Sequence, residues 1–341
     1  MRIPARTRPV AAVVAATASA LTLLAIGAGA AGFGTSAAGG KAASRFPVTG
    51  YVLEGGSAKL INAQGSRASD IGLDGALVSR DGASLVIDSA LYPGLRAAHR
   101  KGLRASLLVA NYDNRLGDFS ADNASHLLKS EANRAAVVAQ LAGEVEAHGW
   151  DGITIDLEAL DDDNRQGMLD FLTGLRAALP AGKTIDIDIP ASAAPGGYQW
   201  KPFDRVAIAK IVDHVVIMSY DQHYQGGTPG PIGGLPWVKK TIDTALTQIP
   251  RSKLRLGIAG YGYLWRKGKP TRDLSDAQAR GLAAGRGRWS AKQKEWTVKV
   301  KGGGVIWWSD ARSMKIRIAL AKRRGLQGAA VWRLGSADNF R

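Results

Sequence analysis

Two carboxylates, Asp156 and Glu158, interrupt a stretch of the chain that otherwise has the pattern of a buried β-strand. Apolar and polar side chains alternate over residues 153–158, so a strand here directs both carboxylates to one face, roughly 6–7 Å apart at the backbone. Buried carboxylates are costly unless they are paired, protonated or functional. The spacing does not suit an acid and a nucleophile on opposite sides of a bond. It favours a relay in which Asp156 tunes Glu158 as an acid–base group.

The stretch 149–158 lies between two segments with helical patterns, residues 130–148 and 164–178. An amphipathic strand at the edge of a sheet would show the same alternation. Helices on both sides of a strand are instead typical of a parallel sheet that is covered on both faces. We therefore expect the polar face of this strand to point into the interior of the protein.

Eight segments have strand-like patterns, and helical patterns separate most of them. This count predicts an α/β fold, a (β/α)₈ TIM barrel, in which functional side chains gather at the carboxyl ends of the strands. A long interval rich in Lys, Arg and Trp, about residues 266–310, predicts a small inserted subdomain between the last two strands. The predicted strands cover residues 46–53, 72–80, 104–112, 149–158, 184–191, 214–221, 254–262 and 328–334, and the predicted helices cover 90–100, 130–148, 164–178, 201–211, 237–249 and 311–324.

The first 44 residues differ in kind from the rest. Arg2, Arg6 and Arg8 precede an apolar run over residues 10–32, and a stretch of small residues follows. This arrangement is typical of an export signal and a linker, although the run is also near the length of a membrane anchor. Either interpretation places the catalytic domain, residues 45–341, outside the cytoplasm.

Composition excludes several classes of site. The chain has no cysteine, so disulfides, thiolate metal sites and a cysteine nucleophile are absent. Its five histidines include no H-x-x-x-H pair, which leaves little basis for a catalytic metal. No cofactor is implied. With 341 residues and 45% hydrophobic content, the chain can bury a full-sized core.

The positive charge is concentrated near the carboxyl terminus. The formal net charge is +16, and residues 239–341 contain 24 Lys and Arg against 6 Asp and Glu. Nucleic acid is one partner for such a surface, but an exported chain first meets anionic cell-wall polymers and lipid head groups. A solvated basic surface without a dedicated partner is the alternative.

The motif over residues 151–158, DGITIDLE, resembles the D-G-x-D-x-D-x-E signature of glycoside hydrolase family 18, the chitinase family. Residues 218–221 resemble the family's M-x-Y-D, Trp332 resembles its tryptophan at the end of strand eight, and many members carry a small α+β subdomain where the insertion lies. Residues 307–313 and 325–328 are most similar to the bacterial branch of spore-germination and cortex-lytic hydrolases. The resemblance covers roughly residues 46–340.

The resemblance implies hydrolysis of a β-linkage next to an N-acetylhexosamine. Glu158 would protonate the leaving oxygen and later activate water. The acetamido oxygen of the substrate would attack the anomeric carbon with overall retention, a route outside the usual scheme of two catalytic carboxylates. Asp156 and the Tyr220 hydroxyl would hold the resulting oxazolinium ion.

The resemblance also implies which residues bind substrate. Asp221 would position the sugar, and Trp332 would form the floor beneath the reacting ring, since sugar faces stack on aromatic surfaces. Met218 and Thr154 complete this set. Thr154 departs from the family, whose middle Asp exchanges a proton with the next one. A neutral hydroxyl there would shorten the relay and shift the pKa of the acid.

We expect a secreted glycosidase, associated with the cell wall, that acts on peptidoglycan or chitin as a monomer. A lectin-like protein on the same barrel with attenuated catalysis is the alternative, and Thr154 is its only sign. The retained Glu158, Asp156 and Tyr220 favour the enzyme. Nucleic-acid binding is disfavoured because no recognised motif for it is present. A stable membrane partner is expected only if the N-terminal segment stays uncleaved.

Overall fold

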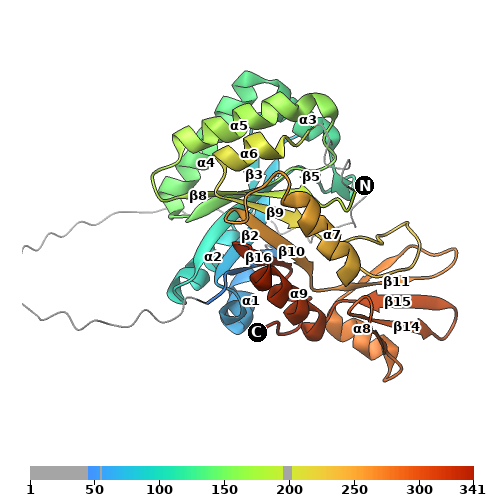
Figure 1. The fold of residues 1–341 in the computed structure, drawn as a ribbon. Coiled ribbons are helices and arrows are strands. Elements are labelled where there is room, and N and C mark those ends of the chain that lie inside the picture. The colour runs from blue at the N-terminus through green and yellow to red at the C-terminus, as the bar shows by residue number, and fades with distance from the viewer. Residues whose placement is uncertain (1–44, 54–55, 195–201) are drawn as a thin grey trace, which may run out of the picture.

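The computed structural model describes residues 45–53, 56–194 and 202–341. Eight parallel strands pair in the order β1-β2-β4-β7-β8-β9-β10-β16, and β16 pairs with β1, so the sheet closes into a barrel (Figure 1). The predicted α/β barrel of eight strands is thereby confirmed. The barrel strands are Val48–Leu53 (β1), Asp70–Val78 (β2), Arg104–Ala110 (β4), Gly152–Asp156 (β7), Thr184–Pro190 (β8), His214–Met218 (β9), Leu254–Ala259 (β10) and Gly328–Trp332 (β16).

Helices on the outside of the barrel connect these strands (Figure 1). A short strand, Leu85–Ile87 (β3), pairs antiparallel with β2, and a two-stranded hairpin of Tyr112–Asp113 (β5) and Asp118–Phe119 (β6) follows β4. The helices are Ser57–Gln64 (α1), Leu91–Arg100 (α2), Ala121–Lys129 (α3), Glu131–His148 (α4), Arg165–Ala178 (α5), Arg205–Ile211 (α6), Leu235–Ala245 (α7) and Ala311–Arg323 (α9), with 3₁₀ turns at Gly65–Arg67 and Asp162–Asn164.

Strands β7 and β8 divide their residues between two faces. The isoleucines of both strands pack outward into the large apolar core beneath the helices, where each fully buried side chain contributes roughly 1.5–3 kcal/mol. The alternate residues Thr154, Asp156, Asp186 and Asp188 therefore point into the barrel. The ladder pairs Thr154 with Asp186, so two residues further along it brings Asp156 level with Asp188.

A second sheet stands between β10 and β16. It has five antiparallel strands in the order β12-β11-β15-β14-β13 and packs on one helix, Asp276–Ala283 (α8). Figure 1 shows it beside the barrel, next to α7 and α9. The sheet begins at Gly262, four residues before the predicted insertion, because Gly262 pairs with Trp308 at its other end. Its strands are Gly262–Trp265 (β11), Arg272–Leu274 (β12), Arg288–Ser290 (β13), Glu295–Val300 (β14) and Gly304–Trp308 (β15).

Several predicted boundaries differ from the structure. The strand predicted over 214–221 ends at Met218, because the backbone N–H groups of Ser219 and Tyr220 donate to carbonyls two residues back (2.8 Å each) and the chain turns. The strand predicted over 254–262 divides into β10 and β11. The predicted helix 201–211 begins at Arg205, and Lys201 lies outside the described residues, as does the predicted segment 1–44. Within the described ranges no helix is both long and apolar enough to cross a membrane.

Candidate active site

Asp156 is the last residue of β7, and Glu158 follows two residues later at the carboxyl end of the barrel. Both side chains are largely withdrawn from water, with 3% and 7% of their surface exposed. The next residue, Ala159, has a φ of 55°, a left-handed conformation that side chains other than glycine rarely adopt. The backbone thus turns sharply just after Glu158, a kind of strain that is common at functional positions.

Asn111, at the end of β4, fixes the backbone of Glu158. Its amide oxygen accepts the N–H of Glu158, and its amide nitrogen donates to the carbonyl of Glu158, both at 2.8 Å. The same nitrogen donates to the carbonyl of Ser120 (2.8 Å), and Asn111 is fully buried. Asparagine can donate and accept at once, so this single side chain holds Glu158 in register with the neighbouring strand.

Tyr220 follows β9, and its hydroxyl lies close enough to Asp156 and Glu158 for their charges to act on it. Burial raises the pKa of its hydroxyl well above the ordinary value, and the charges of Asp188, Asp156 and Glu158 raise it further. The hydroxyl therefore stays protonated and is available as a donor. A Cβ at position 257 would lie 2.6 Å from the carbonyl oxygen of Ile217 and 3.1 Å from the Tyr220 ring, which explains the glycine there. Met218 lies at the end of β9, 6% exposed.

Asp221 is held by two tyrosines of the insertion. The hydroxyls of Tyr261 and Tyr263 both donate to its Oδ1, at 2.5 and 2.8 Å. Burial raises the pKa of Asp221 to about 6, although the two hydrogen bonds lower it. Tyr261 packs edge-on against Tyr220, with ring centroids 6.3 Å apart. The insertion thus forms part of the site through the residues that anchor Asp221.

The raised pKa of Asp221 predicts a pH-dependent stability. The folded state holds this proton more tightly than the unfolded state, whose carboxyl titrates near 3.8, so stability falls as pH rises from about 4 to about 6. The difference between the two pKa values corresponds to about 3 kcal/mol. Asp221→Asn keeps the oxygen that both tyrosines use, and we expect denaturant unfolding to show a variant more stable than wild type at pH 7 and equal to it at pH 3.5. An equal decrease in both proteins would contradict this origin.

Trp332 lies half-buried at the end of β16, and two contacts place it beside the residues described above. Its ring lies 5.6 Å from that of Tyr51 on β1, centroid to centroid. Both Trp332 and Tyr220 pack on a cluster from the start of the insertion, which includes Tyr261, Tyr263 and Trp265. The structure therefore brings Glu158, Asp156, Tyr220, Asp221, Met218 and Trp332 to one end of the barrel.

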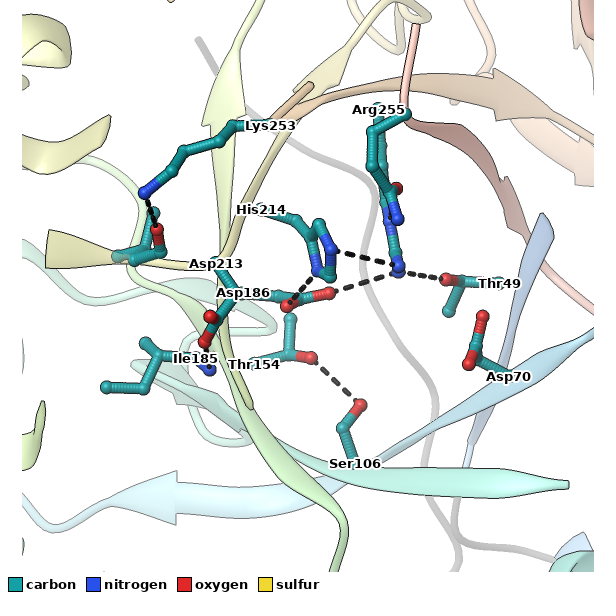
Figure 2. Close-up of polar contacts among 12 residues, drawn as sticks. Thr49, Asp70, Ser106, Thr154, Ile185, Asp186, Asp213, His214, Lys253 and Arg255 are labelled. Carbon is teal, nitrogen blue, oxygen red and sulfur yellow. Dashed lines mark hydrogen bonds and ion pairs between the residues drawn. The ribbon is translucent and has the colours of Figure 1, made fainter. Parts of the chain in front are cut away.

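Thr154 is not part of that group. It is 1% exposed, and its hydroxyl lies 2.9 Å from that of Ser106 on β4 (Figure 2). On β7 it lies two residues before Asp156, one layer lower in the barrel. Figure 2 also shows Arg255 between Thr49 and Asp186, with His214 bonded to the other oxygen of Asp186. A cavity of about 550 Å³ at the amino ends of the strands, opposite the carboxylates, is lined by Thr49, Ser106, Asp186, His214 and Arg255 among others. In TIM barrels the residues at this end contribute to stability, whereas the active site lies at the opposite end.

Two residues of the site, Asn111 and Asp188, were not assigned by the sequence analysis. Asp188, on β8, is 2% exposed and accepts a hydrogen bond from the Tyr51 hydroxyl (2.8 Å). The signal was available, since Asp186 and Asp188 alternate with isoleucines just as Asp156 does. Two tryptophans of the insertion, Trp296 and Trp308, stack on each other with ring centroids 5.9 Å apart.

This arrangement can perform acid–base chemistry. A carboxyl group with a fixed backbone, a second carboxylate beside it and a neutral phenol converge where the strands end. In the part of the chain that the structure describes, no three His, Asp or Glu side chains are grouped so that they could hold a metal ion.

Comparison with known proteins agrees with this geometry. The "Uncharacterized glycosylase YvbX" of Bacillus subtilis is 26% identical over 266 residues, 74% of this chain and 76% of that protein. The cortical fragment-lytic enzyme of Bacillus anthracis is 28% identical over 243 residues, 67% of this chain but 56% of that enzyme, so this chain spans little more than half of that relative.

Solved structures share the fold. The spore cortex-lytic enzyme SleL of Bacillus cereus has a TM-score of 0.77 at 24% identity, covering 86% of this chain and 72% of that one. A chitinase from Chromobacterium violaceum has a TM-score of 0.78 at 24% identity, covering 87% and 96%. Residues 95–338, well over half of the chain, match the sequence profile of glycosyl hydrolases family 18. The chain therefore belongs to glycosyl hydrolases family 18 and is a glycosidase.

Proposed function

We propose that this glycosidase cleaves β-linked N-acetylhexosamine polymers, peptidoglycan or chitin, by retaining, substrate-assisted hydrolysis. Glu158 protonates the leaving oxygen and then activates water. Asp156 and Tyr220 hold the oxazolinium ion formed by the acetamido group of the substrate, while Asp221 and Trp332 bind the sugar. Export across the membrane, directed by the signal segment within residues 1–44, belongs to the same proposal.

The convergence of Glu158, Asp156 and Tyr220 at the carboxyl end of the barrel is the observation that carries this proposal. Asn111 holds Glu158 through two backbone hydrogen bonds, as expected of a group that must meet one substrate oxygen. The names of the relatives, a cortical fragment-lytic enzyme and a chitinase, support the substrate class.

Product analysis tests the proposal. Purified protein is incubated with chitin oligosaccharides and with peptidoglycan, and the products are identified by mass spectrometry. We expect new reducing ends at N-acetylhexosamine. A matched substrate in which hydroxyl replaces the acetamido group should not be cut, since its nucleophile is missing. Equal cleavage of both substrates would overturn the substrate-assisted route, and binding without any product would favour the lectin-like alternative.

We also propose that the basic C-terminal third helps to retain the protein on anionic wall polymers. Most of its charge is at the surface: Arg266, Lys267 and Lys269 are exposed in the turn between β11 and β12, whereas Asp276 and Glu295 are buried. Arg255 and Arg317 of the same segment are also buried, so burial leaves the excess of basic over acidic residues unchanged, and that excess lies outside the core. Attraction between exposed charges is screened beyond about 10 Å at 0.1 M salt.

Cosedimentation with purified walls should consequently fall as salt rises to about 0.5 M. The triple variant Arg266→Glu, Lys267→Glu, Lys269→Glu should sediment less than wild type at low salt. Lys59→Glu, which reverses one exposed charge on α1, provides a control and should change retention little. Retention that is indifferent to salt would rule out this electrostatic role.

A further inference from the structure

Two carboxylates of β8 point into the barrel, and their surroundings differ. Asp186 has a cationic partner and a second polar one: its oxygens lie 3.1 Å from a nitrogen of Arg255 and 2.8 Å from His214 Nδ1. Asp188, one layer higher, accepts its hydrogen bond at Oδ1 from the neutral hydroxyl of Tyr51 (2.8 Å). It is also almost completely buried. A structural ion pair explains Asp186, but it does not explain Asp188.

The ladder between β7 and β8 places Asp188 beside Asp156. Thr154 pairs with Asp186 in this ladder. The same register places Asp156 opposite Asp188 two residues later, with their backbones about 5 Å apart. On its other side Asp156 pairs with Ala110 of β4, and Asp188 pairs with Val216 of β9. Both carboxyl groups are almost completely buried, with 3% and 2% of the residue surface exposed, so little water screens the charge of one from the other.

Thr154 does not reach this pair. Its hydroxyl bonds sideways to Ser106 in the layer below. A carboxyl group at position 154 would lie before Asp156 on the same strand and face, which is where the family pattern has its middle Asp. In this chain the carboxyl group that can act as the partner of Asp156 is that of Asp188, which comes from the adjacent strand β8.

Electrostatics agrees with the geometry. Burial raises the pKa of Asp188 well above its ordinary value, and the neighbouring Asp156 raises it further. Asp186, one layer below, also raises the pKa of Asp188, whereas the Tyr51 hydroxyl from β1 and Arg255 from β10 lower it. Asp188 in turn raises the pKa of the Tyr220 hydroxyl. Two carboxylates this close in an apolar region cannot both be ionised, so the pair retains one proton over a wide pH range.

We propose that Asp188 is a positioning residue for Asp156, sharing one proton with it across β7 and β8 and so taking the place of the carboxyl group that Thr154 lacks. The proton resides on Asp188 Oδ2, since Oδ1 accepts the Tyr51 hydrogen bond, and Asp156 keeps the negative charge that faces the reaction. Asp188 forms no bond to substrate. This inference rests on the proposed function of Glu158 and Asp156.

The test is the pH dependence of kcat/KM for Asp188→Asn. A pair that shares a proton loses its first proton at lower pH than a single carboxyl group does. The amide keeps the shape and can still accept from Tyr51, but Asp156 then titrates alone. We expect the acid limb of the kcat/KM profile to move to higher pH by about one unit, which is about a tenfold loss of kcat/KM at a given pH on that limb. The basic limb, which Glu158 sets, should stay in place.

Two further variants make the outcome specific. Thr154→Asp in the Asp188→Asn background restores a carboxyl group beside Asp156 and should return the acid limb toward its wild-type position. Asp186→Asn is the matched control, a buried carboxylate one layer lower on the same strand. It should lower the melting temperature, because its ion pair with Arg255 breaks, and move the acid limb by much less than Asp188→Asn does, since Asp186 lies one layer below Asp156.

An acid limb that is unchanged in Asp188→Asn, or that moves equally in Asp186→Asn, would overturn the inference. Glu158→Gln, measured alongside, separates this failure from failure of the proposed function. If Glu158→Gln is inactive and Asp188→Asn titrates as wild type, only the role of Asp188 is wrong. If Glu158→Gln retains activity, the proposed active site is wrong.

Discussion

Replacing Glu158 by glutamine should reduce turnover by about a hundredfold or more, because it removes the transferable proton and keeps the shape. The backbone of residue 158 stays clamped by Asn111, so folding should be unaffected. Binding of oligosaccharide should survive, and the loss should therefore appear in kcat and not in KM. The measurement is steady-state kinetics on an N-acetylated oligosaccharide, with affinity determined separately by calorimetry.

Asp156→Asn provides the companion variant. It keeps a hydrogen-bonding group and removes the negative charge that would face the oxazolinium ion, so its loss should also lie mainly in kcat. Asp122→Asn, on the surface helix α3 and outside the barrel, is a control for the same change of residue type. Wild-type activity in Glu158→Gln would assign the acid to another group.

The second large effect is expected from Arg317→Met, which breaks a buried ion pair. Arg317 is 1% exposed and donates to Glu295 (2.8 Å), while Glu295 also accepts the backbone N–H groups of Ile232 and Gly233 (2.7 and 2.9 Å). The pair thus joins α9, the insertion and the segment that follows β9. Loss of Arg317 leaves the buried charge of Glu295 without its cationic partner, which costs about 3–5 kcal/mol.

Denaturant unfolding at pH 7 measures this cost. Adding Glu295→Gln to Arg317→Met should recover part of the stability, because the buried charge is removed while an acceptor for the two N–H groups remains. Arg324→Met, which breaks the exposed pair with Asp243, is the matched control and should cost about 0–1 kcal/mol. If both arginine variants lose the same stability, burial of the Arg317 pair is not what makes it important.

The alternation of residue types allowed much of the fold to be predicted. Period-two patterns located the strands of the barrel and the inward direction of Asp156 and Glu158, because successive side chains of a strand point to opposite faces. Strand ends were less predictable. Residues 219–221 are as strand-like as those before them, and only the local turn, with Asp221 at a φ of 55°, ends β9 at Met218.

The sequence by itself determined the two carboxylates, the tyrosine and aspartate after the sixth strand and the tryptophan after the eighth. Only the tertiary structure decided what surrounds them. Asn111 meets Glu158 from 47 residues away, and Tyr51 meets Asp188 from 137 residues away. Periodicity tells which side chains point inward, but the closure and register of the barrel decide which of these inward side chains touch, and that information is not local. For this reason Thr154 looked like a lost partner of Asp156, whereas the register of β8 sets another carboxyl group beside it.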